Sequence, residues 1–425
     1  MSKDAPLTVA VIGAGIVGLC AALEIQRDGH HVILIEPGEP GGRQSASYGN
    51  ATWINPGAIA PISLPGLWRK VPGFLLDRTG PFTVRWRDLP RHAGWLARFI
   101  AAGRDWDRIA TSARQRYPLC KGTVVDHRNY AAEAGVSDLI RQQGLMYVYP
   151  DRTVFAAESR IWSLRREFGV RFSEIEEAEL RRLQPELSPH YRFGARLDDA
   201  GQIADPGAYC AALARLLEAR GMRRIAGRAT GFVMERGRLS AVTTDQGSLS
   251  CDRAVLAAGI GSASLARLAG DRVPLISERG YHVVIPEPGI ALGVGLMPSD
   301  GQMGVVSTPQ GLRLAGQVEL ADPAAAPDWR RTDILLGYAR KMFPEQAMRF
   351  DTAEIDRWMG NRPSTPDALP CIGFASRSRD ILHAFGHAHT GLTQAPATGK
   401  LVAALIDGRE PPFDPVPYSA RRFAQ

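Results

Sequence analysis

The stretch Val9-Ala10-Val11-Ile12-Gly13-Ala14-Gly15-Ile16-Val17-Gly18 decides the fold of this chain. The apolar run 7–12, which contains β-branched residues, predicts a fully buried parallel strand. Of the glycines that follow, Gly13 allows a tight turn, Gly15 lets the backbone approach a pyrophosphate, and Gly18 lets the next helix pack closely on the strand.

A helix, a second strand and an acid complete the unit. The helix is expected over 16–27, and its unpaired N–H groups and dipole favour an anion at its N-terminus. Strand 31–35 follows and leads to Glu36, which lies 18 residues after Gly18, where an acid binds a ribose hydroxyl. An acid here disfavours NADP, whose extra phosphate prefers an arginine. A glycine-rich turn in an ordinary βαβ unit is the alternative, but the ordered strand, turn, helix, strand and acid favour a dinucleotide site.

A second glycine-rich signature lies near the other end of the chain, Phe385-Gly386-His387-Ala388-His389-Thr390-Gly391-Leu392-Thr393. The sequence predicts a strand ending at Phe385 and a helix over about 391–407, whose N-terminus would face an electron-rich ring. Two such signatures indicate one cofactor held at both ends, which fits FAD better than NAD.

The amino-acid composition limits the classes of protein to which the chain can belong. With 425 residues, 45% hydrophobic and 22% charged, the chain is expected to be globular with two domains. Its net charge of +7 comes from dispersed basic residues, which argues against nucleic-acid binding. No stretch approaches the roughly 18 apolar residues of a spanning helix, and residues 1–8 do not resemble a signal peptide. The five cysteines are scattered without metal-ligand spacing, so we expect a reduced compartment and no metal site.

Two segments between the signatures have unusual composition. The small polar residues of 41–50 suit a loop that lies along a phosphate chain, although an ordinary surface loop has the same composition. Residues 56–100 contain recurrent prolines, which exclude a continuous helix. Within them, 64–87 interleaves large apolar residues with arginine and lysine. Two interpretations stay open: a peripheral contact with a membrane surface, or a connection packed on the protein's own core.

The remaining elements follow from periodicity and turn residues. Asp205 and Pro206 predict the start of one helix, as N-cap and first helical residue. In folds with two dinucleotide motifs, a strand that ends in small residues, such as 253–259, approaches the cofactor. The expected helices are 104–135, 158–168, 206–220 and 330–343, and the expected strands lie near 145–149, 191–197, 224–235, 238–244, 253–259, 281–285, 303–307 and 311–319.

With these motifs in place, the chain resembles the FAD-dependent amino acid oxidoreductases of the D-amino acid oxidase and glycine oxidase superfamily. It is similar in particular to bacterial D-amino acid dehydrogenases, including the D-hydroxyproline dehydrogenase branch. The 386–393 loop differs from that of some membrane dehydrogenases of the family, which leaves the substrate and the electron acceptor open. The resemblance spans residues 9 to about 406 and rests on the N-terminal fingerprint with Glu36 and on 43–51, 279–282, 358–367 and 386–393.

The resemblance implies catalytic roles for three residues. Arg362, in a Gly-x-Arg-Pro motif, would bind the substrate carboxylate, because a guanidinium forms two parallel charge-assisted hydrogen bonds. The alternative is a surface arginine beside a proline turn. Tyr281 would donate its hydroxyl to the same carboxylate, or lies half-buried on a strand. His389 would line the site, or caps the loop.

The resemblance also implies non-covalent FAD, because no cysteine or histidine of these motifs is clearly placed for a covalent bond. His387 has the same two interpretations as His389, and a metal between these two histidines lacks a third ligand. The expected cofactor-binding residues are Gly13, Gly15, Ile16, Val17, Gly18, Glu36, Arg43, Gln44, Ser45, Ser47, Ala258, Gly259, Gly261, Gly386, His387, Gly391, Leu392 and Thr393.

The implied reaction is the oxidative deamination of a D-amino acid or D-imino acid such as D-hydroxyproline. A hydride leaves the substrate Cα for flavin N5, and the electrons pass to a quinone or another carrier. Three alternatives remain: an oxygen-using glycine, sarcosine or D-amino acid oxidase, a nicotinamide-dependent dehydrogenase, and a non-catalytic flavin-binding subunit. The expected location is the cytoplasm, either free or peripheral on the inner face of the plasma membrane.

The expected fold class is α/β, with a Rossmann-type FAD-binding domain and an α+β substrate domain whose antiparallel sheet covers the flavin. The FAD-binding domain is expected to take 1–58, 200–272 and 355–425. The substrate domain is expected to take 59–199 and 273–354.

Overall fold

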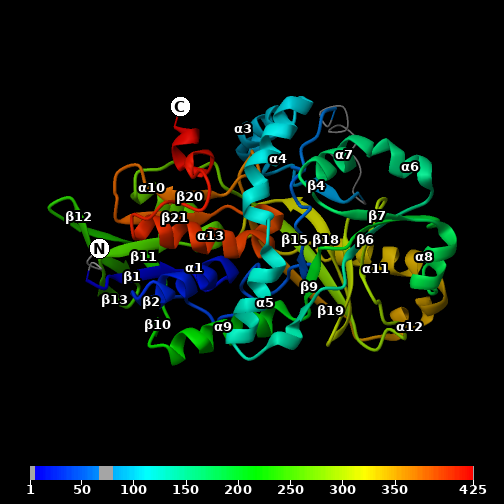
Figure 1. Ribbon diagram of the computed structural model, residues 1–425, viewed down its shortest axis with the longest axis horizontal. Helices are drawn as coiled ribbons and strands as arrows, with labels where there is room; N and C mark the ends of the chain where they lie inside the picture. Colours follow the sequence, from blue (N-terminus) through cyan, green and yellow to red (C-terminus); the bar gives the residue numbers. More distant parts are fainter. Residues whose placement is uncertain (1–4, 67–79, 425) are drawn as a thin grey trace.

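The computed structural model describes residues 5–66 and 80–424. In this part of the chain two large sheets lie side by side, one mostly parallel and one mostly antiparallel (Figure 1). The N-terminal strand and the C-terminal helix α13 (Gly391–Ile406) belong to the same half of the molecule. The two glycine-rich signatures are therefore close in space although they are far apart in sequence.

The parallel sheet has six strands within the described residues. Each strand pairs in parallel with its neighbours, except the last, which is antiparallel. The order is β10 (Arg223–Ile225), β2 (His31–Ile35), β1 (Thr8–Ile12), β14 (Arg253–Leu256), β21 (Ile381–Phe385) and β20 (Cys371–Phe374).

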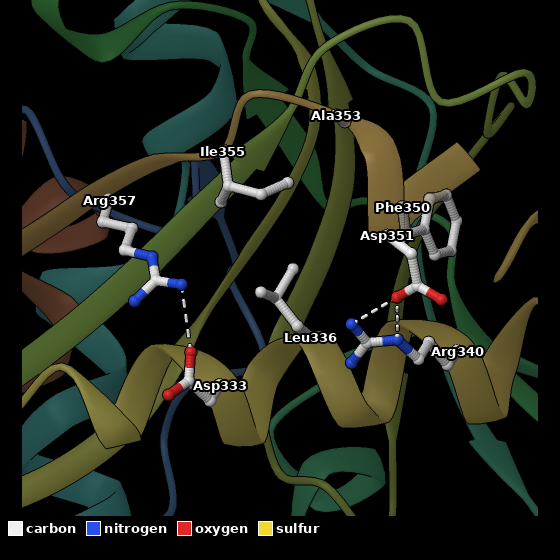
Figure 2. A pocket seen from close by; sticks show the side chains of 8 residues that line it. All are labelled: Asp333, Leu336, Arg340, Phe350, Asp351, Ala353, Ile355 and Arg357. Carbon is white, nitrogen blue, oxygen red and sulfur yellow. Dashed lines mark hydrogen bonds and ion pairs between the residues drawn. The ribbon is translucent and has the colours of Figure 1, made fainter. Parts of the chain in front are cut away.

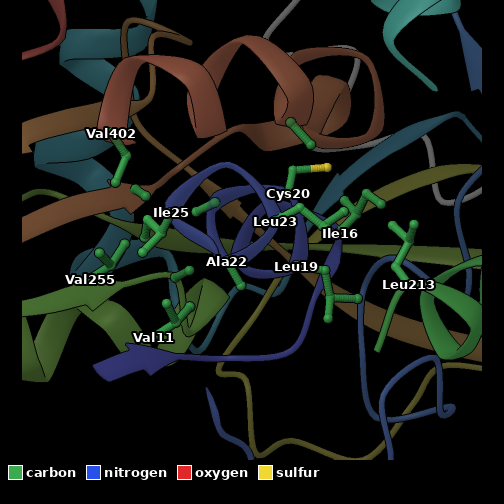
Figure 3. Packing of buried hydrophobic residues seen from close by; sticks show 14 of the residues in the cluster. Val11, Ile16, Leu19, Cys20, Ala22, Leu23, Ile25, Leu213, Val255 and Val402 are labelled. Atoms are coloured by element: carbon green, nitrogen blue, oxygen red, sulfur yellow. The ribbon is translucent and has the colours of Figure 1, made fainter. Parts of the chain in front are cut away.

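Both faces of this sheet are buried, which explains why β1 is apolar throughout. Val11 packs with helices α1 (Ile16–Arg27), α9 (Pro206–Ala219) and α13 (Figure 3), and Val9 belongs to the same cluster. Ala10 and Ile12 point the other way and pack against a three-stranded sheet. Helix α13 approaches α1 closely at Gly399, where a Cβ would lie 2.7 Å from the Cys20 carbonyl oxygen. The small sheet consists of β11 (Ala229–Glu235), β12 (Arg238–Thr244) and β13 (Gly247–Ser250).

The second sheet carries nine strands in the described part of the chain. Its order is β19 (Asp356–Ser364), β15 (Ile276–Ile285), β18 (Gly311–Leu320), β17 (Gly304–Thr308), β16 (Gly295–Pro298), β6 (Leu145–Tyr149), β8 (Phe193–Leu197) and β7 (Phe172–Ile175), with β4 (Phe82–Val84) beside β18.

Strand β15 gives this sheet two distinct faces. Tyr281 and Val283 pack with α11 (Arg330–Met342) on what we call the outer face. Because side chains alternate along a strand, Glu278, Gly280 and His282 lie on the opposite, inner face. The Nδ1 atom of His282 lies 3.3 Å from the carbonyl oxygen of Gly49, so the inner face looks toward the loop after β2.

A β-bulge interrupts the pairing of β15 with β18. The register shifts between Arg279 and Tyr281, and Gln317 on β18 has a left-handed φ of 60°. A bulge leaves backbone groups without their ladder partners. The carbonyl oxygens of Gly316 and Gln317 are consequently available to a side chain.

Two expectations for secondary structure need correction. The helix expected over 104–135 is two helices, α4 (Trp106–Cys120) and α5 (Thr123–Glu133), because Gly122 adopts a left-handed φ of 74° between them. The strand expected over 224–235 is also two strands, and its first part, β10, joins the parallel sheet. Strand β19, within the segment expected in the FAD-binding domain, pairs with β15 of the second sheet.

The apolar and basic segment 64–87 falls partly on residues 67–79, which lie outside the described residues. Its described end includes β4, paired with β18. The other strands and α-helices of the described residues are β3 (Trp53–Ile54), β5 (Ile140–Arg141) and β9 (Gly201–Ile203), which form a small sheet, and helices α3 (Leu89–Ala102), α6 (Arg152–Ala157), α7 (Ser159–Glu167), α8 (Glu177–Leu183), α10 (Ser262–Leu268) and α12 (Ala347–Thr352).

Candidate active site

Three predicted cofactor segments meet at the carboxyl ends of neighbouring parallel strands. They follow β1, β14 and β21, which are adjacent in the sheet. A Cβ at Gly13, whose φ is 109°, would overlap the carbonyl oxygen of Ala257 at the end of β14. The predicted residues Ala258, Gly259 and Gly261 come directly after it. Ligands of open α/β sheets bind at this edge.

The N-terminus of α1 forms a small polar cradle. A Cβ at Gly15 would lie 3.5 Å from the hydroxyl of Ser47 and 3.7 Å from that of Ser45. The Ile16 N–H donates to the Ser47 hydroxyl over 3.0 Å. Within the described residues, the Val17 N–H has no hydrogen-bond partner. Unpaired N–H groups at a helix start, beside small hydroxyls, suit a pyrophosphate.

The other glycine of the fingerprint sets how closely α1 approaches β1. A Cβ at Gly18 would overlap the carbonyl oxygen of Gly13 and lie 3.3 Å from the Ala257 methyl group. Only a residue without a side chain fits there. The predicted close packing at Gly18 therefore has a direct geometric basis.

Glu36 lies beside the same turn. Its carboxylate accepts hydrogen bonds from the N–H groups of Ala14, over 2.9 Å, and Gly38, over 3.2 Å. A carboxylate has about four lone-pair sites, so two remain for a ribose hydroxyl. The contact with Ala14 also ties the end of β2 to the glycine turn.

The side chains of two predicted cofactor-binding residues form hydrogen bonds with other parts of the protein. Arg43 makes two hydrogen bonds to the Asp356 carboxylate, over 2.9 and 3.0 Å. Gln44 donates to the carbonyl oxygen of Glu39 over 2.6 Å. The structure brings Ser45 and Ser47 to the cradle but directs the Arg43 and Gln44 side chains to other partners.

The C-terminal signature connects β21 to α13. Gly386 has a left-handed φ of 88°, and Gly391 begins the helix. The Thr393 hydroxyl accepts a hydrogen bond from the Asn55 N–H over 3.1 Å. His387 is buried, with its Nε2 atom 2.9 Å from the Thr398 hydroxyl. Burial, aided by the charge of Arg116, lowers the pKa of His387 to about 3. His387 thus connects the loop to helix α13 through Thr398.

Sequence reasoning missed two residues that support this loop. His127 on α5 lies with Nε2 2.8 Å from the Leu392 carbonyl oxygen and Nδ1 3.0 Å from the Tyr209 hydroxyl. Arg116 on α4 is buried and donates to the Ala58 carbonyl oxygen and the Thr390 hydroxyl. No local sequence signal marks either residue, because the contacts join segments that only the tertiary fold brings together.

We expect His127 to make the protein sensitive to acid. Burial lowers the pKa of His127 from 6.5 to about 4. Between these pH values the unfolded chain binds a proton that the folded chain excludes. The free energy of unfolding is therefore complete above about pH 6.5 and falls by up to about 3 kcal/mol toward pH 4. Thermal midpoints at pH 7 and pH 5 measure this fall, which His127→Gln should reduce. The exposed control His190→Gln should not change it, and an equal fall in both variants would contradict the assignment.

Arg362 on β19 lies across β15. A Cβ at Gly280 would overlap its guanidinium group, so glycine makes room for it. One nitrogen, Nη1, donates to the Gln317 carbonyl oxygen over 3.0 Å, and Nη2 donates to that of Gly316 over 3.4 Å. These are the two carbonyl groups of the bulge. Burial lowers the pKa of Arg362. Within the described residues, no carboxylate forms an ion pair with this group.

A buried carboxylate and a histidine lie near Arg362. Glu278, opposite Arg362 in the strand register, contacts Nε2 of His389 over 2.5 Å. Burial favours a higher pKa for Glu278, but its hydrogen bond with His389 and the charge of Arg362 outweigh burial and hold that pKa below its usual range. Burial lowers the pKa of His389 despite the nearby carboxylate. The structure therefore brings Arg362 and His389 together, with a glutamate that sequence reasoning did not select.

Tyr281 lies on the outer face, away from Arg362. Its hydroxyl donates to the Glu319 carboxylate over 2.5 Å and accepts from the Asp328 N–H over 3.0 Å. Burial and the neighbouring carboxylate raise the pKa of Tyr281. The alternation of side chains along β15 accounts for this position, since Gly280 and His282 take the inner face.

Two cavities lie away from the glycine loops. One, of about 420 Å³, is on the outer side between α11 and the start of β19 (Figure 2). Its charges are already paired, Asp333 with Arg357 over 3.0 Å and Arg340 with Asp351 over 2.6 Å. The other, of about 1080 Å³, lies at the amino ends of β14 and β21. Neither contains the predicted site residues.

Two further features are absent among the described residues. No group of three or more histidine, cysteine, aspartate or glutamate residues is placed to hold a metal ion. No helix in 5–66 or 80–424 combines the length and the apolar character needed to span a bilayer.

The fold has the glycine-rich turns of a dinucleotide-binding protein, and its second sheet contacts the loop after β21 through the bridge between Ser364 and His387. Residues 8–405 match the family described as FAD dependent oxidoreductase, and the chain belongs to that family. The protein is thus an FAD-dependent oxidoreductase. FAD fits the observed site, because the Gly13–Gly18 turn is closed to side chains and the cradle at Gly15 is open and polar.

Relatives over the whole length of the chain support this assignment. A D-amino-acid oxidase from Bradyrhizobium diazoefficiens is 44% identical over 98% of both chains. The D-amino acid dehydrogenase 2 of Pseudomonas aeruginosa is 31% identical over 96% of both.

Solved structures confirm the predicted fold class. An L-proline dehydrogenase from P. horikoshii superimposes with a TM-score of 0.74 at 21% identity, covering 99% of this chain and 98% of that one. A glycine oxidase from Bacillus cereus gives 0.71 at 16% identity, covering 95% and 96%.

Proposed function

We propose that this protein catalyses the oxidative deamination of a D-amino acid or D-imino acid and passes the electrons to a quinone or another carrier. The observation that carries the proposal is Arg362, a half-buried arginine on the inner face without an ion-pair partner among the described residues. A guanidinium in this position suits a carboxylate ligand. The names of relatives across the whole chain support an amino acid substrate.

In this proposal the protein mainly orients the substrate. Arg362 binds the carboxylate, and its two hydrogen bonds to the bulge carbonyl groups fix the plane of the guanidinium. The fixed carboxylate in turn sets which face of the substrate Cα is presented. The bound FAD supplies the hydride acceptor. Released imine is hydrolysed to a keto acid and ammonia, whereas a cyclic substrate yields a cyclic imine.

The cofactor is proposed to lie with its pyrophosphate at the N-terminus of α1 and its ribose at Glu36. Its ring system is proposed to lie at the start of α13, near Gly391, Leu392 and Thr393. The division into an FAD-binding and a substrate domain stays a proposal, with β19 as the strand that links them by sheet pairing. Tyr281 is left out of the proposed substrate contacts because of its place on the outer face.

An anaerobic titration tests the proposed reaction. The purified protein with FAD is mixed with D-amino acids, L-amino acids, glycine, sarcosine and cis-4-hydroxy-D-proline, and the oxidised flavin absorption is followed. We expect at least one D-substrate to bleach it and the matching L-enantiomer to leave it unchanged. A flavin that none of them reduces would contradict the proposal and favour a non-catalytic subunit.

An oxidase is the second candidate, favoured by the name of the Bradyrhizobium relative. The two candidates differ in the fate of the electrons. A dehydrogenase forms little hydrogen peroxide in air and turns over faster with a quinone analogue, whereas an oxidase forms one peroxide for each substrate. Measuring peroxide with and without the quinone analogue separates them, and flotation with anionic vesicles tests membrane contact through 64–87.

A further inference from the structure

The pair formed by Glu278 and His389 connects the two halves of the site. Glu278 belongs to β15 of the second sheet, whereas His389 lies in the loop between β21 and α13. The side chain of Glu278 is 5% exposed and that of His389 is 27% exposed. A buried carboxylate is expensive to desolvate unless it is paired, so this contact is strongly constrained.

The contact also determines which nitrogen of His389 is available. Only Nε2 faces the carboxylate, so a neutral imidazole carries its proton there and donates it. The Nδ1 atom then has a lone pair. Among the described residues Nδ1 has no hydrogen-bond partner. It is also not one of their buried unpaired polar atoms, so it is exposed to solvent. His389 therefore presents an accessible proton acceptor, and its imidazole lies within the electrostatic influence of Arg362.

We propose that His389, held by Glu278, accepts the ammonium proton of the substrate before the carbon–hydrogen bond is broken. The inference rests on the proposed function. One N–H bond of the substrate ammonium breaks and one N–H bond forms at Nδ1 of His389. The products of this step are a neutral amine and an imidazolium ion. The lone pair of the neutral amine would then support the loss of a hydride from Cα, for which bound FAD would be the acceptor.

The charges of the site favour this step. Before the transfer, Arg362 is positive and Glu278 is negative, and the substrate carries a positive ammonium group and a negative carboxylate group. After it, imidazolium pairs with Glu278 and Arg362 pairs with the substrate carboxylate, so every charge has a partner. Without Glu278, the imidazolium ion would form beside the Arg362 cation with nothing to compensate it. Glu278 is thus a positioning residue, and His389 is the group that touches the substrate.

The pH dependence follows from the groups that face His389. These are Glu278 on β15, Arg362 on β19 and Arg116 on α4, of which only Glu278 raises the pKa of the imidazole. Because the net effect lowers that pKa, His389 is neutral and ready to accept a proton at neutral pH. The wild-type kcat/KM should therefore be nearly flat between about pH 7 and pH 8.

The test compares pH profiles of kcat/KM for wild type, His389→Asn and Glu278→Gln with the best D-substrate. His389→Asn should lose about a hundredfold at pH 7, and its kcat/KM should rise about tenfold for each pH unit, following the free amine. Glu278→Gln should lose less and move the acidic limb to lower pH. The control His190→Asn, at an exposed histidine, should match wild type. A flat profile for His389→Asn would overturn the proposal.

A second measurement does not depend on turnover. The 15N chemical shifts of His389 in the wild-type holoenzyme report its tautomer, and we expect the proton on Nε2 and a bare Nδ1. A proton on Nδ1 would overturn the proposal even if both variants failed to fold. If no amino acid reduces the flavin but the tautomer is as expected, the proposed function fails while the geometry of the pair stands.

Discussion

Replacing Arg362 with alanine should lower kcat/KM for the best substrate by about a thousandfold. Each hydrogen bond to a charged group contributes about 1.5–3 kcal/mol, and a bidentate clamp provides two. Since about 1.4 kcal/mol corresponds to a factor of ten, the loss lies between roughly a hundredfold and ten thousandfold. Glu278 would also lose a nearby compensating charge. Steady-state kinetics on protein with verified FAD content measure the effect.

Two further variants separate the clamp from a general loss of charge. Arg362→Lys keeps the charge but not the planar fork, so its activity should lie between those of wild type and Arg362→Ala. Arg357→Ala is the matched control, because Arg357 is exposed on the same strand and pairs with Asp333. It should change kcat/KM by less than about threefold. Unchanged kinetics in Arg362→Ala would remove the carboxylate clamp from the proposed site.

Replacing Gly18 with alanine should yield protein largely without FAD. The added methyl group would overlap the Gly13 carbonyl oxygen, which is backbone and has no flexible end to move aside. Overpacking of this kind costs about 3 kcal/mol, equivalent to a loss of about a hundredfold in cofactor affinity if the turn absorbs the strain. The ratio of flavin to protein absorbance after dialysis, together with the thermal midpoint, measures it.

A second glycine at the other end of α1 provides the control. Gly29 has a left-handed φ of 94°, but an added Cβ would meet nothing within 4 Å. Gly29→Ala should therefore lower stability by about 1 kcal/mol and leave the FAD content unchanged. Equal retention of FAD in the two variants would show that the close approach of α1 to β1 does not govern cofactor binding.

The sequence predicts the fold well where the determining contacts are local. The strand, the glycine turn and helix 16–27 follow from a short stretch because each glycine has a steric role within it. Glu36 is found by its spacing, and the structure places it against Ala14 of the same turn. The two large sheets and their relative arrangement follow from the family resemblance rather than from these local rules.

The parts that could not be predicted depend on long-range pairing. Alternation implies that Tyr281 and Gly280 face opposite sides, but only the packing on α11 shows which side is inner. Arg43 was expected beside a phosphate chain, whereas its side chain binds Asp356 from a distant part of the sequence. Glu278 lacked any local signal, because its importance arises from His389 across the two halves of the protein.

The bulge on β18 has a consequence for how this protein tolerates change. The acceptors that orient Arg362 are main-chain carbonyl groups of Gly316 and Gln317, so exchanging a side chain does not delete either of them. Deleting a single residue at the bulge would take these acceptors away from Arg362, because a shift of one residue turns every following side chain to the other face of the sheet. The orientation of the Arg362 guanidinium therefore depends on the number of residues in the strand. We expect homologues to conserve that number more strictly than the identity of the side chains at the bulge.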